Sequence, residues 1–374
     1  MIRRALLPSL AALALVACAI PPPKAMPSAT APPLAQPSPL PAPPPPVAHI
    51  RGDLGQARAE FVRSTSRRFG IPQAEIEAVL AKAEIRDSII AAMSRPAEAK
   101  PWRDYRPIFI QPKRIDGGRA FQATHRTALQ RAESAHGVPA ELITAIIGVE
   151  TSYGGNKGSF PVVDALYTLA FAYPRTGDPA KHARENQREA FFRDELAQLF
   201  ALAKEENLDI GSLKGSYAGA MGWGQFMPSS YRDYAVDGDG DGRRDLFNNL
   251  DDVFASVANY FAKKGKWQAN GPVMQRATRA PGAADFVNPG NSVTLDQTLA
   301  GLQAKGYRPE RLRYLHTEGG PPVTLVTLEG AAGPEYWIVY NNFKAITTYN
   351  ISRLYATAVH QLAESIAGRD PDPR

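Results

Sequence analysis

The sequence predicts a mainly α-helical protein with a small β element. Apolar residues recur at helical spacing through most of the chain after Gly52. Glycine and proline stand at the points where these helical segments begin and end. Strand-like runs are few, and two of them, 322–330 and 335–341, are separated by only four residues. We therefore expect one β-hairpin beside a helical body.

The expected helices have clear boundaries. Gly70-Ile71-Pro72 separates the first two. Residues 117–137 predict one long amphipathic helix that ends at Gly137. Pro139 follows in the first turn of the next helix, where its missing N–H costs nothing. Helices are expected at 54–70, 72–85, 117–137, 138–150, 188–208, 251–265 and 351–368, and the glycine-, proline- and asparagine-rich stretch 271–320 is read as an insertion.

Composition limits the classes of protein that the chain can represent. Its 374 residues, 44% of them hydrophobic, suffice for one large or two ordinary domains with a packed core. The net charge of +6 comes from 43 basic and 37 acidic residues that are well mixed, so no basic run argues for nucleic acid as a partner. The single cysteine excludes an intrachain disulfide and any metal site built from several thiolates.

That cysteine closes a segment with the layout of a lipoprotein signal peptide. Two arginines precede a short apolar run, 5–17, and the sequence LVAC (15–18) resembles a bacterial lipobox. The run is too short to span a bilayer comfortably. We expect 1–17 to be a signal peptide and Cys18 the lipidated first residue of the mature chain. An ordinary signal peptide with an incidental cysteine is the alternative, and Ala19, where inner-membrane lipoproteins often carry aspartate, favours the outer membrane.

A proline-rich linker is expected at 18–50. Residues 21–47 contain 13 prolines and one charged residue, Lys24. Such a segment has too few apolar side chains for a core and favours extended polyproline II, which would reach about 80 Å. The remainder, 51–374, would then be the folded region, held away from a membrane.

Glu150 is the unusual residue of an otherwise apolar helix. It lies three, four and seven residues after Ile147, Ile146 and Ile143, so all four share one face. Desolvation and the negative end of the helix dipole would both raise its pKa. A carboxylic acid that stays protonated near neutral pH suits general acid catalysis. A glutamate that snorkels to solvent or pairs with a buried arginine is the structural alternative.

Four segments carry the most specific motifs of the chain. They are IIGVETSYGG (146–155), KGSYAGAMGWGQFMPSSY (214–231), SVANYF (256–261) and NNFKAITTYNISRLYATAVHQLA (341–363). Glycines in the second segment let the backbone approach a ligand closely, although tight helix packing would also use them. Together, in this order, the segments resemble the membrane-bound lytic transglycosylase B family, whose members cut the glycan strands of bacterial peptidoglycan.

The resemblance implies a lysozyme-like helical catalytic domain with small α and α/β subdomains, and it assigns roles to single residues. The catalytic acid falls on Glu150, and a serine that could orient it falls on Ser216. The substrate-binding positions are Ser216, Gln225, Tyr260, Tyr349, Asn350, Tyr355, Tyr105 and Arg175. The segment 176–190, just after Arg175, is longer than the family usually shows.

The mechanism implied by the resemblance uses a single carboxyl group. Neutral Glu150 would protonate the oxygen between N-acetylmuramic acid and N-acetylglucosamine, while the muramic 2-acetamido oxygen, held by Asn350, stabilises the charge at C1. Glu150 would then take the proton of the C6 hydroxyl, which closes onto C1 as a 1,6-anhydro ring. Two alternatives stay open: a muramidase that uses water, and a peptidoglycan-binding lipoprotein without turnover.

An aspartate-rich loop, DGDGDGRRDLFNNLD (237–251), resembles a calcium site. Asp237, Asp239 and Asp241 occupy positions 1, 3 and 5 of an EF-hand, and a glycine occupies position 6. Position 12 is Asn248 instead of the usual glutamate. A solvated loop in which Asp251 caps the next helix is the alternative.

The same family resemblance implies a fifteen-residue, EF-hand-like variant of this loop. Its last carboxylate falls on Asp251, and Arg243 would contribute its backbone carbonyl. We therefore expect structural Ca²⁺ and no organic cofactor. The expected partners are peptidoglycan strands and, through the lipid, the outer membrane. The protein would face the periplasm as a monomer that could join cell-wall enzyme complexes.

Overall fold

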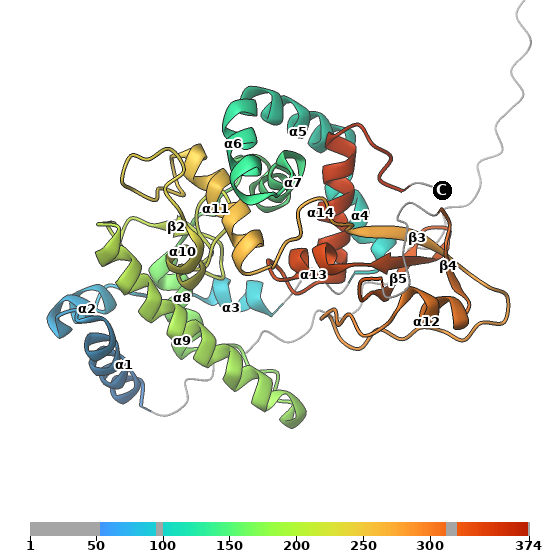
Figure 1. The fold of residues 1–374 in the computed structure, drawn as a ribbon. Helices are drawn as coiled ribbons and strands as arrows, with labels where there is room; N and C mark the ends of the chain where they lie inside the picture. Colours follow the sequence, from blue (N-terminus) through green and yellow to red (C-terminus); the bar gives the residue numbers. More distant parts are fainter. Residues whose placement is uncertain (1–52, 95–99, 312–319, 373–374) are drawn as a thin grey trace, which may run out of the picture. The chain divides into compact units, whose positions relative to one another are not determined.

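The structure is a computed structural model, and it describes residues 53–94, 100–311 and 320–372 (Figure 1). The predicted signal peptide, Cys18 and the proline-rich linker lie outside the described residues. Within those ranges the fold is mostly helical, as the sequence predicts, and it contains a two-stranded and a four-stranded sheet. None of the described helices is both long enough and apolar enough to cross a membrane.

The expected helices appear in order, and the described residues contain six more that the sequence did not predict, at 87–93, 102–109, 162–171, 228–234, 299–304 and 341–347. Two of the predicted segments also differ from the structure. The described helices are α1 (Leu54–Phe69), α2 (Gln73–Leu80), α3 (Asp87–Met93), α4 (Trp102–Phe109), α5 (Pro112–Thr124), α6 (Arg126–His136), α7 (Ala140–Thr151), α8 (Val162–Phe171), the 3₁₀ turn η2 (Pro179–Lys181), α9 (His182–Glu205), α10 (Pro228–Tyr234), α11 (Leu250–Lys263), α12 (Leu299–Ala304), α13 (Asn341–Thr347) and α14 (Arg353–Ile366). Gly70 and Gly137 end α1 and α6 in the left-handed conformation, with φ of 61° and 69°.

The first difference is that residues 117–137 do not form one helix. His125, with φ −106° and ψ 21°, separates α5 from α6, and α5 begins earlier, at Pro112. The break allows the two halves to pack on different partners: α5 contacts α7 and α14, and α6 lies along α11. The His125 ring packs on Phe121 of α5 and on Phe254 of α11. Tertiary packing therefore overrides the continuous helical pattern.

The second difference lies between residues 271 and 311, where the sequence predicted no strands and the structure forms two strands of a sheet. The sheet contains β3 (Met274–Arg279), β4 (Tyr307–Pro309), β5 (Thr324–Gly330) and β6 (Gly333–Val339), in the antiparallel order β4-β3-β6-β5. The predicted hairpin is β5–β6, in which Val326 faces Trp337. Strands β3 and β4 show no strict alternation of apolar and polar residues, which is why the sequence did not reveal them.

Two helices form the centre of the core. Every residue of α8 is buried, and α8 packs along α9. Most of α7 is buried as well, and it packs along α14. Ile143, Ile146 and Ile147 of α7 are fully buried, and each contributes about 1.5–3 kcal/mol relative to an exposed side chain. This burial anchors the helix that carries Glu150.

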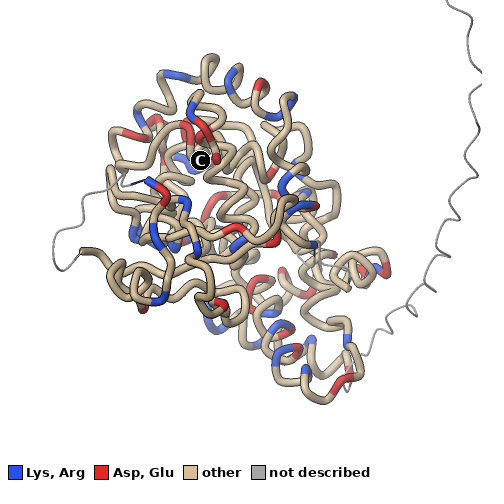
Figure 2. The backbone as a smooth tube through the Cα atoms, turned by 90° about the vertical axis from the view of Figure 1, so that its right-hand side faces the viewer, with Lys and Arg blue, Asp and Glu red and all other residues tan. Residues whose placement is uncertain are grey.

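Two helices and a short strand pair connect the four-stranded sheet and the glycine-rich segment to this core. Helix α4 contacts both α14 and β5, and α13 contacts both α14 and β6 (Figure 1). The two-residue strands β1 (Phe160–Pro161) and β2 (Lys214–Gly215) pair antiparallel and bring the glycine-rich segment beside the chain that follows α7. Charged residues of both signs are interspersed along the backbone (Figure 2).

Candidate active site

Glu150 lies in the last turn of α7, and its carboxyl group meets a tyrosine from the far end of the chain. Tyr355 lies in the first turn of α14, and its hydroxyl donates a 2.5 Å hydrogen bond to Glu150 Oε1. The two residues are 205 positions apart, and the packing of α7 on α14 brings them together. Glu150 is half-buried and Tyr355 is buried.

Desolvation makes Glu150 a proton donor near neutral pH. Burial raises its pKa to about 7, and the hydrogen bond from Tyr355 opposes this rise. Within the described part of the chain Glu150 has no ion-pair partner, so the structural alternative of a pair with a buried arginine is not what the structure shows there. The pKa of Glu150 is therefore shifted in the predicted direction, and desolvation is the main cause.

Tyr355 is itself held as a donor. Burial raises its pKa well above 10, and the neighbouring Glu150 carboxyl raises it further. Tyr105, another predicted site residue, lies close enough to add to this effect. The Tyr105 ring is buried between Trp102 and Phe109, at centroid distances of 6.3 and 5.2 Å. Tyr105 thus lies on α4, which packs on α14, near enough to Tyr355 to affect its pKa.

Tyr349 and Tyr260 form an aromatic cluster near Glu150. Their rings are 4.9 Å apart, and Phe226 and Phe261 pack on Tyr349 at 5.9 and 5.5 Å. The hydroxyl of Tyr349 donates to the Gly224 carbonyl at 2.6 Å, and that of Tyr260 donates to the Thr348 carbonyl at 2.5 Å. Burial comes first among the causes that raise the Tyr349 pKa well above 10, and the Glu150 carboxyl comes second.

The glycine-rich segment forms a tight loop in which polar side chains bind backbone groups. Ser216 Oγ accepts hydrogen bonds from the N–H groups of Ala218 and Ala220, at 3.3 and 3.0 Å. It makes no hydrogen bond to Glu150, so among the described residues the orienting group is Tyr355 instead. The Gln225 amide donates to two backbone carbonyls, those of Lys157 and Gly222. Its φ of 51° is a left-handed value.

Two predicted substrate-binding residues have other surroundings. Arg175 has a side chain that is only 6% exposed; it pairs with Glu185 and Glu189 of α9 and lies over the Tyr173 ring. This placement favours a structural role over the predicted contact with substrate. Asn350 is half-buried in the turn before α14, where its carbonyl accepts from Ser352 N–H at 2.7 Å.

The aspartate loop brings carboxylates together, although not the predicted set. Oxygen atoms of Asp237, Asp239 and Asp252 lie within 4.8 Å of one another. Asp251, the predicted last ligand, instead pairs with Arg131 of α6. Asp241 accepts from its neighbour's N–H, that of Arg243, at 2.8 Å. Because successive helical residues point about 100° apart, the first turn of α11 turns Asp252, not Asp251, toward the loop.

Backbone N–H groups of the loop donate hydrogen bonds that stabilise its carboxylates in the charged form. Asp237 accepts from the N–H groups of Gly240 and Gly242 at 2.6 and 2.8 Å, and the bond from Gly242 is the main cause that lowers its pKa. Asp252 is fully buried and accepts from the N–H groups of Gly238 and Asp245, both at 2.7 Å. These carboxylates fit a hard cation, which prefers oxygen ligands.

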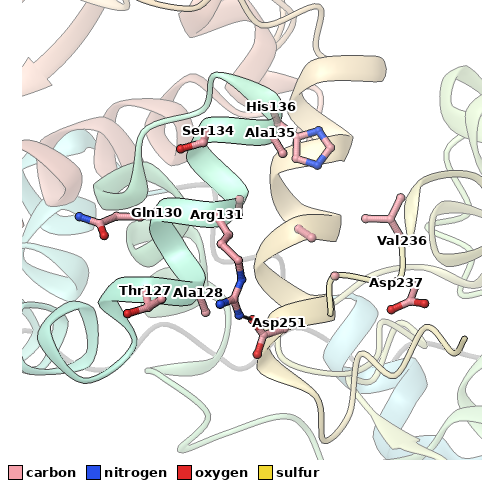
Figure 3. A pocket seen from close by; sticks show the side chains of 13 residues that line it. Thr127, Ala128, Gln130, Arg131, Ser134, Ala135, His136, Val236, Asp237 and Asp251 are labelled. Atoms are coloured by element: carbon pink, nitrogen blue, oxygen red, sulfur yellow. Dashed lines mark hydrogen bonds and ion pairs between the residues drawn. The ribbon is translucent and has the colours of Figure 1, made fainter. Parts of the chain in front are cut away.

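A cavity of about 860 Å³ lies beside this loop and not at Glu150. Helices α6 and α11 and residues 236–238 form its walls (Figure 3). Arg131 reaches from α6 to Asp251 at one side of the cavity, and His136 lies farther along α6. The cavity therefore borders the predicted metal loop.

Sequence reasoning missed three residues that the structure emphasises. Asp252 stands next to the predicted Asp251, and only the direction of α11 separates them. Glu195 is another buried residue with a carboxyl group; burial raises its pKa, and it accepts hydrogen bonds from Ser229 N–H and Oγ. Tyr153, within a recognised motif, packs against glycines of two helices. No local sequence signal indicates the Glu195–Ser229 contact.

The fold and this site define a class of protein. A mostly helical core with small sheets, a glycine-rich loop and a desolvated carboxyl group among tyrosines is a lysozyme-like arrangement. Known proteins agree: residues 54–364 match the family model described as "Transglycosylase SLT domain". The chain belongs to this family of lytic transglycosylases.

Individual relatives support the same assignment. The chain is 35% identical over 318 residues to membrane-bound lytic murein transglycosylase B of Escherichia coli (strain K12), covering 82% of each chain. It resembles the structure of catenated lytic transglycosylase SltB1 of Pseudomonas aeruginosa, at 42% identity and TM-score 0.74, with 85% and 98% of the two chains covered. A third match is the Escherichia coli lytic transglycosylase Slt35 in complex with calcium, at 35% identity and TM-score 0.71, with 83% and 92% covered. The protein is accordingly an enzyme that cleaves glycosidic bonds of murein.

Proposed function

We propose that Glu150 is the single acid and base of this lytic transglycosylase. The observation that carries the proposal is the state of its carboxyl group. Desolvation raises the pKa of this group to about 7, and the Tyr355 hydroxyl donates a 2.5 Å hydrogen bond to it. A general acid works best when its pKa lies near the operating pH. The neighbouring aromatic cluster and glycine-rich loop supply surfaces of the kind that bind sugar rings.

The proposed reaction begins with proton transfer from Glu150 to the oxygen that links N-acetylmuramic acid to N-acetylglucosamine. The C1–O bond breaks, and the 2-acetamido oxygen of the muramic residue stabilises the positive charge at C1. Glu150, now a carboxylate, removes the proton from the C6 hydroxyl of the same residue. The C6 oxygen closes onto C1, which yields a 1,6-anhydro end, restores neutral Glu150 and consumes no water.

The remaining site residues divide into walls and candidate contacts. Tyr260 and Tyr349 use their hydroxyl protons on backbone carbonyls, so we assign their rings to the wall of the site. Tyr355 orients Glu150, and Tyr105 supports Tyr355. Ser216, Gln225 and Asn350 are the polar residues that we propose for contact with the glycan, with Asn350 at the acetamido group.

We also propose that the aspartate loop binds structural Ca²⁺. Asp237, Asp239 and Asp252 would hold the ion in the arrangement that the structure shows, and Asp241, Arg243 and Asp251 belong to the wider predicted set. Three carboxylates within 4.8 Å repel one another without a cation. The calcium complex of the relative Slt35 supports the assignment. The ion would join the loop to the start of α11.

The proposed location is the periplasmic face of the outer membrane. The E. coli relative is named membrane-bound, which supports association with the cell envelope. The finer assignment rests on the sequence alone, through the lipobox-like LVAC, Cys18 and Ala19. Metabolic labelling with a fatty-acid analogue tests it, because Cys18→Ser should abolish both labelling and membrane recovery.

Digestion of purified sacculi, with mass analysis of the products, tests the reaction. The proposal predicts anhydro-muropeptides from the wild type and none above background from Glu150→Gln. Reducing muramic acid from the wild type would identify a hydrolase that uses water. Binding to sacculi without any product would identify a binding protein, and wild-type rates from Glu150→Gln would refute the role of Glu150.

A further inference from the structure

The backbone directly after Glu150 takes a conformation that its residues rarely adopt. Ser152, Tyr153 and Gly154 have φ values of 51°, 59° and 85°, so three successive residues are left-handed. Glycine adopts this conformation freely, but a bulky side chain such as tyrosine does not. Such a turn persists only where the surrounding structure holds it.

A socket of glycines holds the Tyr153 ring. A Cβ atom built on Gly148 of α7 would lie 2.6 Å from the Tyr153 hydroxyl oxygen, and one built on Gly118 of α5 would lie 2.5 Å from it. A Cβ on Gly117 would meet the ring edge at 3.3 Å. The ring therefore fills a space that exists only because these helical positions carry no side chain.

Hydrogen bonds fasten the ring and both helices together. The Tyr153 hydroxyl donates to the Arg114 carbonyl of α5 at 2.8 Å, and the Arg114 guanidinium donates to the Gly148 carbonyl of α7. Burial raises the pKa of the Tyr153 phenol well above its ordinary value, so the hydroxyl keeps its proton at any pH at which the enzyme would work. Phe121 of α5 packs on the same ring at 5.5 Å.

The glycine-rich segment holds the turn from the other side. Thr151 Oγ1 donates to the Trp223 carbonyl at 3.1 Å and accepts from Gly154 N–H at 3.1 Å. The Trp223 ring lies against Gly154, where an added Cβ would stand 2.3 Å from it. The turn is thus fixed between α5 and the loop that carries Ser216.

We propose that Tyr153 is a positioning residue for Glu150. Its ring, seated in the glycine socket, keeps the left-handed turn and the last turn of α7 in place, and thereby keeps the Glu150 carboxyl on Tyr355. Without the ring, Ser152 and residue 153 can relax to ordinary φ values, and Glu150 can rotate toward water. This inference rests on the proposed role of Glu150 as acid and base.

Two tyrosine variants and a matched control test the inference on solubilised glycan strands. Tyr153→Ala should lower kcat about 100-fold, the scale of a displacement of roughly 1 Å, with little change in KM. Tyr153→Phe should lower kcat about 5-fold, because it loses one hydrogen bond. Tyr307→Phe removes a buried hydroxyl that donates to the Ala284 carbonyl at 2.7 Å in the sheet, and it should leave kcat unchanged.

The pH profile separates positioning from simple loss of stability. Once the Tyr153 ring or its hydrogen bond to the Arg114 carbonyl is lost, Glu150 becomes better solvated, so the fall of kcat/KM with rising pH should begin at a lower pH than in the wild type. The shift should be large in Tyr153→Ala, which loses the ring, and smaller in Tyr153→Phe, which loses only the hydrogen bond. If Tyr153 only stabilised the fold, its substitution would lower the melting temperature without moving this alkaline limb of the kcat/KM profile. If Tyr153→Ala does not fold, the limb of Tyr153→Phe decides the question.

The socket offers an independent test, because alanine is the better helix former at each glycine. Gly148→Ala should cost more activity than Gly117→Ala, in the order of the contact distances. Adding Gly148→Ala to Tyr153→Ala should cause little further loss, since the ring that the new Cβ would strike is already absent. Equal losses from both glycine variants, or full additivity, would overturn the inference.

The same experiments distinguish this inference from the proposed function. An active Glu150→Gln variant would refute the catalytic role whatever Tyr153 does. An inactive Glu150→Gln variant together with a Tyr153→Ala variant of wild-type kcat and wild-type pH limb would refute the positioning role alone.

Discussion

Glu150 and Asp237 are carboxyl groups of one molecule with opposite pKa shifts. Glu150 stands at the C-terminal end of an apolar helix, where desolvation raises its pKa to about 7. Asp237 stands on an exposed loop, where backbone N–H groups, first that of Gly242, lower its pKa. The surroundings thus favour the neutral form of the carboxyl group in one region and its anionic form in the other.

The comparison shows what decides the role of an acidic residue here. Each N–H group that points at a carboxylate favours the charged form, whereas lost hydration favours the neutral form. Around Glu150 one phenol is the only hydrogen-bond donor in the described ranges, and around Asp237 three backbone N–H groups converge. In the proposed roles, the surroundings of each carboxyl group, not the residue type, separate catalysis from cation binding.

The largest expected effect is the loss of catalysis in Glu150→Gln. In the proposed mechanism Glu150 serves as both acid and base, so kcat should fall about 1,000-fold or more. Glu195→Gln is the matched control, since Glu195 is also buried with a raised pKa but lies on α9. It should keep kcat within a few-fold while its melting temperature falls. Equal losses in both variants would show that burial of a carboxyl, rather than its place, matters.

Calcium should have the next largest effect, on stability. At a free Ca²⁺ concentration of 100 times Kd, binding to the folded state adds about 2.7 kcal/mol to the free energy of unfolding, which raises Tm. Asp237→Asn should abolish this rise. Asp209→Asn changes another exposed aspartate that accepts from a backbone N–H two residues on, and it should keep the rise. A wild type whose Tm ignores Ca²⁺ would contradict the assignment.

Tyr355→Phe should have a moderate effect of the opposite sense on pH dependence. Removing the hydroxyl takes away the one hydrogen bond that lowers the Glu150 pKa, so that pKa rises further. The alkaline limb of kcat/KM should therefore move to higher pH, opposite to the shift expected for Tyr153 variants. Loss of this hydrogen bond also leaves the Glu150 carboxyl less firmly oriented, which should lower kcat about 10-fold. An unmoved limb would remove Tyr355 from the account of Glu150.

The smallest expected effect concerns Arg131. Its ion pair with Asp251 is partly exposed and should contribute about 0–1 kcal/mol to stability. Arg131→Ala frees Asp251 and removes a positive charge beside the loop (Figure 3), so calorimetry should show Ca²⁺ binding a few-fold tighter. Arg126→Ala, on the same helix, is the control. Weaker Ca²⁺ binding in Arg131→Ala would show that the pair shapes the loop instead of competing with the ion.

The predictable part of the fold was the part that local chemistry decides. Gly70 and Gly137 ended helices as expected, and the β5–β6 hairpin formed between the two apolar runs. The break at His125 and strand β3 depend on contacts with α11 and β6, which are distant in sequence. Periodicity within a segment carries no information about such partners.

The candidate site shows the same division. Helical spacing placed Glu150 on a buried face and gave the sign of its pKa shift, and the family motifs indicated the glycan. The role of Tyr355 could not be derived locally, because the contact joins residues 205 positions apart. Which carboxylate of the first turn of α11, Asp251 or Asp252, faces Asp237 and Asp239 depends on the direction of that helix, which local sequence does not give.

The most direct test of the central claim is the pH dependence of kcat/KM of the wild-type enzyme on solubilised glycan strands. General acid catalysis by a desolvated Glu150 predicts activity that falls as pH rises through about 7. The same limb should disappear in Glu150→Gln, whose residual activity would not titrate there. A wild-type limb near the ordinary glutamate pKa of about 4.5 would contradict the claim that desolvation turns this carboxyl into the acid.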